Sequence, residues 1–167
     1  MVIFDFDQTL VNTGPVEHLR RQRRWREVMQ RAPSLEIYSG IPELLGELHE
    51  SGEPLAIVTK SPSMVAKSFI DRHRWPIDVL IGYHDVSRVK PDPEGLLLAM
   101  RRAGVRPQNT LHVGDQAQDT QAARAAGVTA IGSAWGLSDH SELRASKPDG
   151  IFETVAAFRR YLRARKR

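Results

Sequence analysis

Five short apolar runs, separated by stretches with helical spacing, constrain the fold of this chain more than any other feature. The runs are Val2–Phe4, Leu55–Val58, Val79–Ile81, Leu111–Val113 and Val128–Ile131. A short, predominantly apolar run is typical of a strand that is buried on both faces. Strands that alternate with helices form a parallel sheet covered on both sides. We therefore predict an α/β fold with a doubly wound, Rossmann-like parallel sheet of five strands and helices on both faces.

Boundary signals accompany the helical patterns. Apolar residues from Ile41 to Leu48 recur at i, i+3, i+4 and i+7, with Pro42 in the first turn and Gly52 just past the end. Further helices are expected between Asp92 and Gly104, over 116–126, and through Val155, Phe158 and Leu162.

One stretch, residues 12–40, interrupts the alternation directly after the first strand. It contains one arginine-rich helical pattern, Val16–Arg31, which Pro33 ends. With 167 residues, 41% of them hydrophobic, the chain can bury one full core but leaves little room for a second large domain. We predict a single domain, 1–167, with 12–40 as a small helical cap insertion.

The charge balance favours anionic partners, because 24 Lys and Arg oppose 20 Asp and Glu, a formal net charge of +4. Arginines cluster at Arg20–Arg26 and at Arg159–Arg167. A solvated basic face is the commoner meaning of such a cluster, and nucleic-acid binding through Arg20–Arg26 stays open as an alternative.

The chain has no cysteine, which excludes disulfides and thiolate metal sites. With neither a signal peptide nor an apolar membrane span, we expect a cytoplasmic monomer or homodimer without membrane contact.

Two acidic pairs follow predicted strands. Asp5 and Asp7 come directly after the first strand, and alternation along an extended chain places both on one side with Phe6 on the other. Asp115 ends the fourth strand, and Asp119 lies one helical turn later on the same face. Alone, each pair is compatible with ordinary strand ends and helix caps. If the first and fourth strands are neighbours, however, three or four carboxylates meet at the ligand-binding edge of the sheet, and oxygen-only ligands favour Mg²⁺.

Further candidate residues lie after the second strand and in the loop after the third. Thr59 ends the second strand, and the run Thr59, Lys60 and Ser61 offers hydroxyl and backbone N–H groups that can bind an anion near a helix start. Lys90 precedes a helix whose entry two prolines restrict. Each of these residues has an ordinary structural explanation when taken alone. The strong signal is their order along the chain, in which an acid pair, a threonine, a lysine and a second acid pair fall at successive strand ends or in the adjoining loops.

This constellation resembles the haloacid dehalogenase-like (HAD) hydrolase superfamily. Asp5, Asp7 and Thr9 match its first motif, Thr59 the second, Lys90 the third, and Gly114–Asp115 with Asp119 the fourth. The residues around Lys90 and from Gly114 to Gly127 are similar to those of the phosphoglycolate phosphatase-like branch. This chain would be a member of that branch with a reduced cap.

The resemblance implies a Mg²⁺-dependent phosphatase that acts on a phosphate monoester. Asp5 would be the nucleophile that forms an aspartyl-phosphate, and Asp7 the general acid/base. Thr59, Lys60 and Lys90 would bind phosphate. The metal set would be Asp5, Asp7, Asp115 and Asp119, with Asp119 orienting either the metal's water or Lys90.

The reduced cap leaves the substrate open, with a small phosphorylated metabolite as the first expectation. One alternative is a phosphatase for nucleic-acid ends or another macromolecule. A second is a phosphotransferase or mutase on the same scaffold, which shares every motif and differs in the group that accepts phosphate from Asp5. A receiver-like signalling module is disfavoured, because receivers carry the acid pair on the first strand and the phosphorylated aspartate on a later one.

Overall fold

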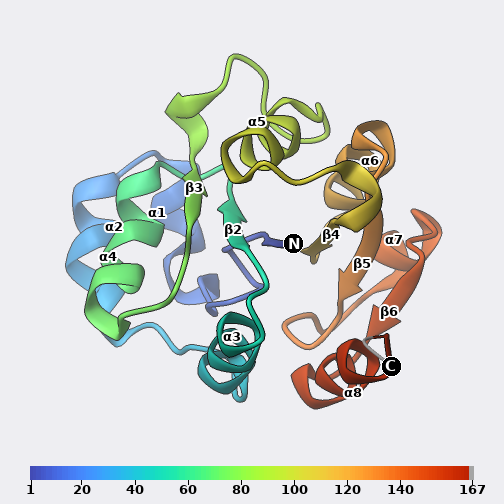
Figure 1. Cartoon of the computed structure of the whole chain (residues 1–167). Coiled ribbons are helices and arrows are strands. Elements are labelled where there is room, and N and C mark those ends of the chain that lie inside the picture. The colour runs from blue at the N-terminus through green and yellow to red at the C-terminus, as the bar shows by residue number, and fades with distance from the viewer. Residues whose placement is uncertain (166–167) are drawn as a thin grey trace.

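A computed structural model, which describes residues 1–165, contains one parallel sheet of six strands in the order β3-β2-β1-β4-β5-β6 (Figure 1). The strands are β1 (Val2–Phe4), β2 (Leu55–Val58), β3 (Val79–Ile81), β4 (Leu111–Gly114), β5 (Thr129–Ser133) and β6 (Gly150–Phe152). All five neighbouring pairs are parallel. The α/β class and the parallel, Rossmann-like sheet are thus confirmed.

The predicted number of strands, five, is wrong. The apolar runs mark β1 to β5 to within two residues at each end, but β6 at the edge of the sheet gives no such signal. It has three residues, begins with Gly150, and is only half-buried along its whole length. An edge strand of this kind lacks the continuous apolar run that reveals a strand covered on both faces.

Helices cover both faces of the sheet. They are α1 (Glu17–Arg21), α2 (Trp25–Arg31), α3 (Ile41–Glu50), α4 (Ser63–His73), α5 (Glu94–Ala103), α6 (Ala117–Ala126), α7 (Ser141–Ala145) and α8 (Val155–Arg165). The buried hydrophobic residues form two clusters. One contains side chains of α3, α4, α8 and the 12–40 segment together with alternate residues of the strands. The other contains side chains of α5 and α6 together with the strand residues that lie between those of the first cluster. Figure 1 shows α5 and α6 on the opposite side of the sheet from α3 and α8.

The predicted helix ends are close to the observed ones where the sequence supplies a terminator. Gly104 and Gly127 follow α5 and α6 with φ of 65° and 70°, the left-handed conformation that glycine adopts at little cost. Helices α4 and α7 were not predicted from the sequence. In α4 the buried Val65, Ala66 and Phe69 follow helical spacing, so a signal for that helix was present.

The 12–40 segment does not contain the single helix predicted over Val16–Arg31. The chain forms two short helices, α1 and α2, separated by a turn in which Arg23 has φ of 56°. The N–H of Arg24 donates to the carbonyl of Leu19 at 2.9 Å and closes this turn. No glycine or proline marks the break, so the sequence pattern gave no warning of it. Figure 1 places α1 and α2 beside α4. The boundaries of a cap domain remain a prediction.

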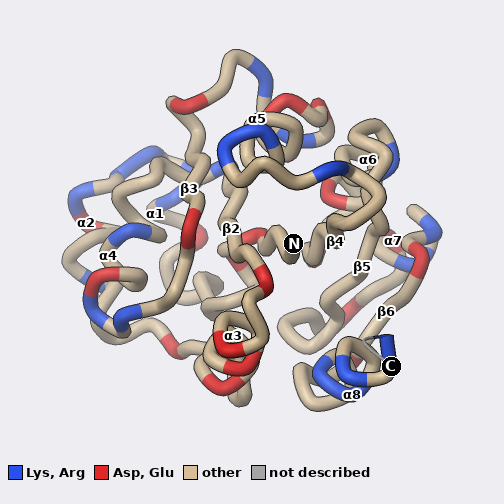
Figure 2. The backbone as a smooth tube through the Cα atoms, in the orientation of Figure 1, with Lys and Arg blue, Asp and Glu red and all other residues tan. Residues whose placement is uncertain are grey.

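The sheet order places a topological switch point between β1 and β4, which pair with Phe4 opposite Val113. From β1 the chain builds outward to β3, then returns to β4 and builds outward on the other side. Ligands bind at such a point, in the crevice at the carboxyl ends of the strands. None of the helices within residues 1–165 combines the length and the apolar composition that a membrane-spanning helix requires. Figure 2 shows basic residues along α1, α2 and α8; the predicted basic cluster Arg159–Arg167 ends with two residues that lie outside the described part.

Candidate active site

Asp5 and Asp7 lie at the switch point, directly after β1. The N–H of Asp5 donates to the carbonyl of Val113 at 2.8 Å, which fixes the start of this loop against β4. Phe6 between them is fully buried in the hydrophobic core and contacts Phe69 edge-on, with ring centroids 5.3 Å apart. The two carboxylates are nearly buried as well, at 6% and 7% exposure, but on the side away from that core.

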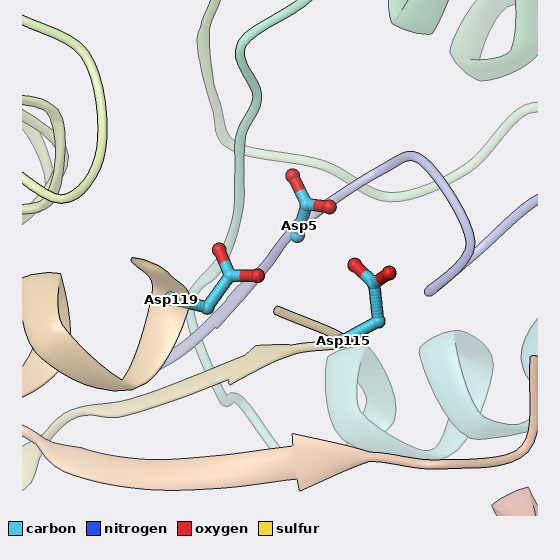
Figure 3. Close-up of side chains that lie close together, drawn as sticks. All are labelled: Asp5, Asp115 and Asp119. Carbon is cyan, nitrogen blue, oxygen red and sulfur yellow. The ribbon is translucent and has the colours of Figure 1, made fainter. Parts of the chain in front are cut away.

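Asp5, Asp115 and Asp119 form a buried acidic trio. Each offers a carboxylate oxygen, and these oxygens all lie within 4.8 Å of one another. Figure 3 shows Asp5 in the loop after β1, Asp115 just past the end of β4 and Asp119 in the first turn of α6, with their carboxylates converging. Gly114 permits this approach, because a Cβ at its position would overlap the side chain of Asp119. The trio joins three of the four predicted metal ligands.

Lys90 is buried between two members of the trio. Its Nζ lies 2.7 Å from Asp5 Oδ1 and 2.6 Å from Asp119 Oδ1, and it donates to the carbonyl of Val58 at 3.0 Å. Burial alone would lower the pKa of the Lys90 ammonium, but Asp119 and Asp5 outweigh burial and raise this pKa above its usual value. Lys90 is therefore a fixed cation. Since an ammonium has three donors and all three are used, the predicted contact with phosphate requires one of them to be shared.

One fixed cation does not balance three carboxylates. Burial raises the pKa of Asp5 to about 7, with Lys90 lowering it and Asp119 and Asp7 raising it. Burial, then the charges of Asp5 and Asp119, raise the pKa of Asp115 well above its usual value. Asp115 Oδ1 is also buried without a hydrogen-bond partner among the described residues. An unpartnered carboxylate oxygen beside two further oxygens fits a hard divalent cation such as Mg²⁺.

His112, which the sequence analysis did not identify, supports Asp119 from within β4. Its ring is fully buried, with Nε2 at 3.2 Å from Asp119 Oδ1 and Nδ1 at 3.1 Å from the carbonyl of Ile3. Asp119 Oδ2 accepts the N–H of Gln116 at 3.0 Å. Burial would raise the pKa of Asp119, but Lys90 and His112 hold it well below its ordinary value. The available signal was a histidine inside an otherwise apolar strand run.

The Asp7 side chain lies outside the trio, in a separate set of contacts. Its Oδ2 accepts hydrogen bonds from Ser61 Oγ at 2.8 Å and from Thr59 Oγ1 at 3.2 Å, and it forms an ion pair with Arg20 Nη2 at 2.8 Å. Its Oδ1 is buried without a partner among the described residues. The predicted phosphate ligand Thr59 thus contacts Asp7 directly. Ser61, expected beside Thr59 and Lys60 as an anion-binding hydroxyl, instead donates to Asp7. Arg20 was expected in the basic cluster Arg20–Arg26, on a solvated face or against nucleic acid, and not beside Asp7.

Lys60 lies apart from these contacts, on the wall of an adjoining pocket. Its Nζ donates to the side-chain oxygens of Gln116 at 2.9 Å and Gln118 at 2.7 Å, and so bridges the loop after β2 to α6. The pocket has a volume of about 300 Å³. Its main side chains are Arg20, Arg21, Arg23, Trp25, Lys60 and Tyr83, and we call it the arginine pocket. Ser61 and His84 also line it.

Comparisons with known proteins show the family to which the chain belongs. The sequence profile of the family described as haloacid dehalogenase-like hydrolase matches residues 15–133. The phosphoglycolate phosphatase of Escherichia coli strain K12 is 34% identical over 122 residues, which cover 71% of this chain and 48% of that protein. The Pseudomonas putida phosphoglycolate phosphatase is 33% identical over 127 residues, covering 72% and 45%. The chain therefore spans about half the length of the curated relatives that it matches.

Solved structures show the same fold. A hydrolase from Pseudomonas syringae superimposes with a TM-score of 0.81 at 21% identity, covering 98% of this chain and 97% of that one. A HAD-superfamily hydrolase from Ehrlichia chaffeensis gives 0.71 at 21% identity, covering 96% and 94%. At this identity the likeness concerns the fold alone, whereas the sequence profile covers most of the chain. The chain belongs to the haloacid dehalogenase-like hydrolase family.

Proposed function

We propose that this chain is a Mg²⁺-dependent phosphatase that hydrolyses a phosphate monoester through an aspartyl-phosphate on Asp5, with Asp7 as general acid/base. The observation that carries the proposal is the buried trio with a fixed cation, in which Lys90 lies within 2.7 Å of both Asp5 and Asp119. A structural ion pair needs one carboxylate for one lysine, whereas this site has one lysine and three buried carboxylates. Such an excess of buried negative charge supports a second cation and an anionic substrate.

Asp5 and Asp115 are the side chains that we assign to the metal, together with the backbone carbonyl of Asp7 that the resemblance adds. Both oxygens of Asp119 are already engaged, by Lys90, His112 and the N–H of Gln116. We therefore assign Asp119 to the positioning of Lys90 rather than to direct coordination. When bound, the cation would offset the repulsion between carboxylate and phosphate and orient the phosphoryl group.

In the first step Asp5 attacks phosphorus. Lys90 holds Oδ1, so we assign the attack to Oδ2. The Oδ2–P bond forms while the bond from phosphorus to the leaving oxygen breaks, and the leaving oxygen keeps the electron pair. Asp7 then supplies the proton. Its Oδ2 is fixed by Ser61, Thr59 and Arg20, so Oδ1 is the atom that we assign to proton transfer.

In the second step water attacks the phosphorus of the aspartyl-phosphate. Asp7 Oδ1, now ionised, takes a proton from this water, and the P–Oδ2 bond breaks to release phosphate and restore Asp5. Dividing one displacement into two in this way lets a single acid/base residue serve both steps. The loop after β2 would bind the phosphoryl oxygens through Thr59, Lys60 and its backbone amides.

A small phosphorylated metabolite is the substrate class that we propose. The curated relatives named above are phosphoglycolate phosphatases, but this chain covers less than half of each. The reduced 12–40 segment would also close over a substrate differently from a larger cap. Location in the cytoplasm and a monomeric or homodimeric state belong to the same proposal.

The test is phosphate release from a panel of phosphomonoesters, with and without Mg²⁺. The panel includes oligonucleotides phosphorylated at either end, which covers the nucleic-acid alternative. We expect Mg²⁺-dependent release that Asp5→Asn reduces by at least about 1,000-fold. The matched control is Asp71→Asn, which changes an exposed carboxylate paired with Lys67. Unchanged release in folded Asp5→Asn protein would exclude Asp5 as the nucleophile.

A second measurement separates hydrolysis from phosphoryl transfer. A phosphatase releases inorganic phosphate with water as the sole acceptor. A mutase or phosphotransferase would release phosphate slowly unless a hydroxyl-bearing acceptor is added, and the phosphate would then appear on that acceptor. Rapid release in buffer alone supports the phosphatase.

A further inference from the structure

A series of buried contacts leaves β1, passes through β4 and α6, and returns to the end of β1. It begins at the carbonyl of Ile3, which lies 3.1 Å from Nδ1 of His112. Nε2 of the same ring lies 3.2 Å from Asp119 Oδ1, and that oxygen lies 2.6 Å from Lys90 Nζ. Lys90 in turn lies 2.7 Å from Asp5 Oδ1. All five residues are buried, so a contact that is lost is not simply replaced by water.

The pairing of β1 with β4 fixes the position of the histidine. Ile3 lies opposite His112 in the parallel register. Side chains alternate along a strand, so His112 lies on the face opposite to Leu111 and Val113, which belong to the core cluster of α3, α4 and α8. The first turn of α6, which carries Asp119, covers the face of His112. The ring therefore lies between a strand carbonyl and a carboxylate.

Both neighbours of the His112 ring accept hydrogen bonds, and neither can donate one. A backbone carbonyl is an acceptor, and so is the ionised carboxylate of Asp119. A charged acceptor forms the stronger hydrogen bond of the two, so we assign an N–H to Nε2, directed at Asp119 Oδ1. His112 then shares this oxygen with Lys90.

The other contacts of Asp119 leave its carboxylate little freedom to turn. Oδ2 accepts the N–H of Gln116 at 3.0 Å, at the start of the same helix. Gly114 packs against the carboxylate so closely that a Cβ at its position would overlap the carboxyl group. Because Oδ1 cannot rotate away from Lys90, a neighbouring donor acts mainly on how strongly this oxygen attracts the ammonium.

The ammonium of Lys90 is divided between two carboxylates, which Figure 3 shows close together. Its contacts with Asp119 and Asp5, at 2.6 and 2.7 Å, are almost equal in length, so neither carboxylate dominates. A hydrogen bond from His112 stabilises the negative charge on Asp119 Oδ1 and weakens its attraction for the ammonium. Without that donor, we expect Lys90 to move toward Asp119 and away from Asp5.

We propose that His112 is a positioning residue for the nucleophile. By donating to Asp119 from β4, it keeps Lys90 on Asp5 Oδ1 and leaves Oδ2 free to attack phosphorus. This inference rests on the proposed phosphatase function. It concerns the attack by Asp5 and not the proton transfer by Asp7, whose contacts lie outside this series.

The test compares two amide replacements of His112. Glutamine can place its amide N–H near the position of Nε2 and so reach Asp119, whereas the shorter asparagine reaches only the position of Nδ1, beside Ile3. With Mg²⁺ and p-nitrophenyl phosphate, His112→Asn should lower kcat/KM by about tenfold or more, and His112→Gln should stay within about threefold of the wild type. The control Thr120→Val removes a buried hydroxyl from the next residue of α6, which contacts Ser146, and should keep the wild-type kcat/KM.

Two further readouts separate positioning from packing. Thermal unfolding gives the Tm of each variant, and a merely structural role predicts that activity follows Tm, with the two amide variants alike. The second readout is the choice of leaving group. An alkyl phosphate and p-nitrophenyl phosphate both need the attack by Asp5, so His112→Asn should lower kcat/KM by similar factors for the two substrates.

A measurement on the wild type avoids any dependence on the folding of a variant. Nitrogen-15 NMR of the histidine ring distinguishes a nitrogen that bears a hydrogen from one that does not. We expect Nε2 of His112 to bear a hydrogen, and an Nε2 without one would overturn the proposed donation to Asp119.

The outcomes separate the inference from the function on which it rests. Activity that glutamine restores and asparagine does not, at similar Tm, supports the positioning role. Equal kcat/KM in the two folded amide variants would overturn it, because the contact with Asp119 would then make no difference. A loss confined to the alkyl phosphate would also overturn it, since His112 would then act through Asp7. No release of phosphate by the wild type, even from p-nitrophenyl phosphate, would reject the phosphatase and the positioning role together.

Discussion

Lys90 determines the charge balance of the acidic trio, because its three donors end on Asp5, Asp119 and the carbonyl of Val58. Its side chain is 3% exposed, and those of its two acidic partners are 8% and 5% exposed. Removing one partner of a buried ion pair leaves an uncompensated charge, which costs far more than the net contribution of the intact pair.

We predict that Lys90→Met lowers the free energy of unfolding by about 3 kcal/mol at pH 8. The loss should be smaller at pH 5, because Asp5, whose pKa is about 7 even beside Lys90, can then take up a proton. Urea unfolding at the two pH values measures both quantities. The control Lys67→Met removes an exposed pair with Asp71 and should change stability by less than about 0.5 kcal/mol. Equal losses in the two variants would contradict a buried charge network.

Ser61 fixes the orientation of Asp7 through a hydrogen bond of 2.8 Å to Oδ2. We predict that Ser61→Ala lowers kcat/KM about tenfold for an alkyl phosphate, whose leaving oxygen needs a proton. The effect on kcat/KM for p-nitrophenyl phosphate should be small, since nitrophenolate leaves without a proton and kcat/KM reports only the steps up to its departure. Ser68→Ala on α4 is the control, because Ser68 donates only to the carbonyl of Val65. An equal loss on both substrates would mean that Ser61 does not act through the acid.

At the scale of single elements, the end of α4 differs from those of α5 and α6. Arg74 follows α4 with φ of 51° and ψ of 43°, where the other two helices have glycine. Its side chain is exposed. We predict that Arg74→Gly raises the free energy of unfolding by about 0.5–1 kcal/mol, because glycine adopts this conformation without a Cβ clash. Arg74→Ala should give no gain, and a comparable gain from alanine would exclude the backbone explanation. Chemical denaturation measures both.

The elements that the sequence predicted are those whose signals are local. Buried strands such as β1 and β2 are continuous apolar runs, and α3, α5 and α6 have proline or glycine at their ends. The break between α1 and α2 has no such marker, because arginine rarely adopts a positive φ and its presence predicts none. The half-buried β6 was invisible for a related reason: an edge strand needs no continuous apolar run.

The residues of the site also divide into those that the sequence could predict and those that it could not. The clustering of Asp5, Asp115 and Asp119 could be predicted because these residues follow β1 and β4, and a parallel sheet brings such strand ends together. Arg20 could not be assigned, since its contact with Asp7 depends on the path of the α1 helix and not on spacing along the chain. His112 was overlooked because a single histidine in a buried strand has no pattern that distinguishes a site residue from a core residue.

For the whole molecule, we expect the acidic trio to make the free energy of unfolding depend on pH and on a bound cation. The pKa of Asp5 rises from 3.8 to about 7 on folding, so the folded chain keeps a proton that the unfolded chain has released. Stability falls with increasing pH wherever the folded state binds more protons. The metal-free protein should therefore lose stability between about pH 4 and pH 7 from this group. A bound divalent cation favours the ionised carboxylate and opposes that loss.

We predict that saturating Mg²⁺ raises the Tm by about 5 °C at pH 8 and by much less at pH 5.5, where the metal must displace protons. Thermal unfolding with NaCl at matched ionic strength separates metal binding from screening. Asp115→Asn should abolish most of the Mg²⁺ effect, because it replaces a carboxylate whose Oδ1 is unpartnered among the described residues. Asp71→Asn should retain the effect. An equal shift at both pH values, or a full shift in Asp115→Asn, would show that the cation binds somewhere other than the trio.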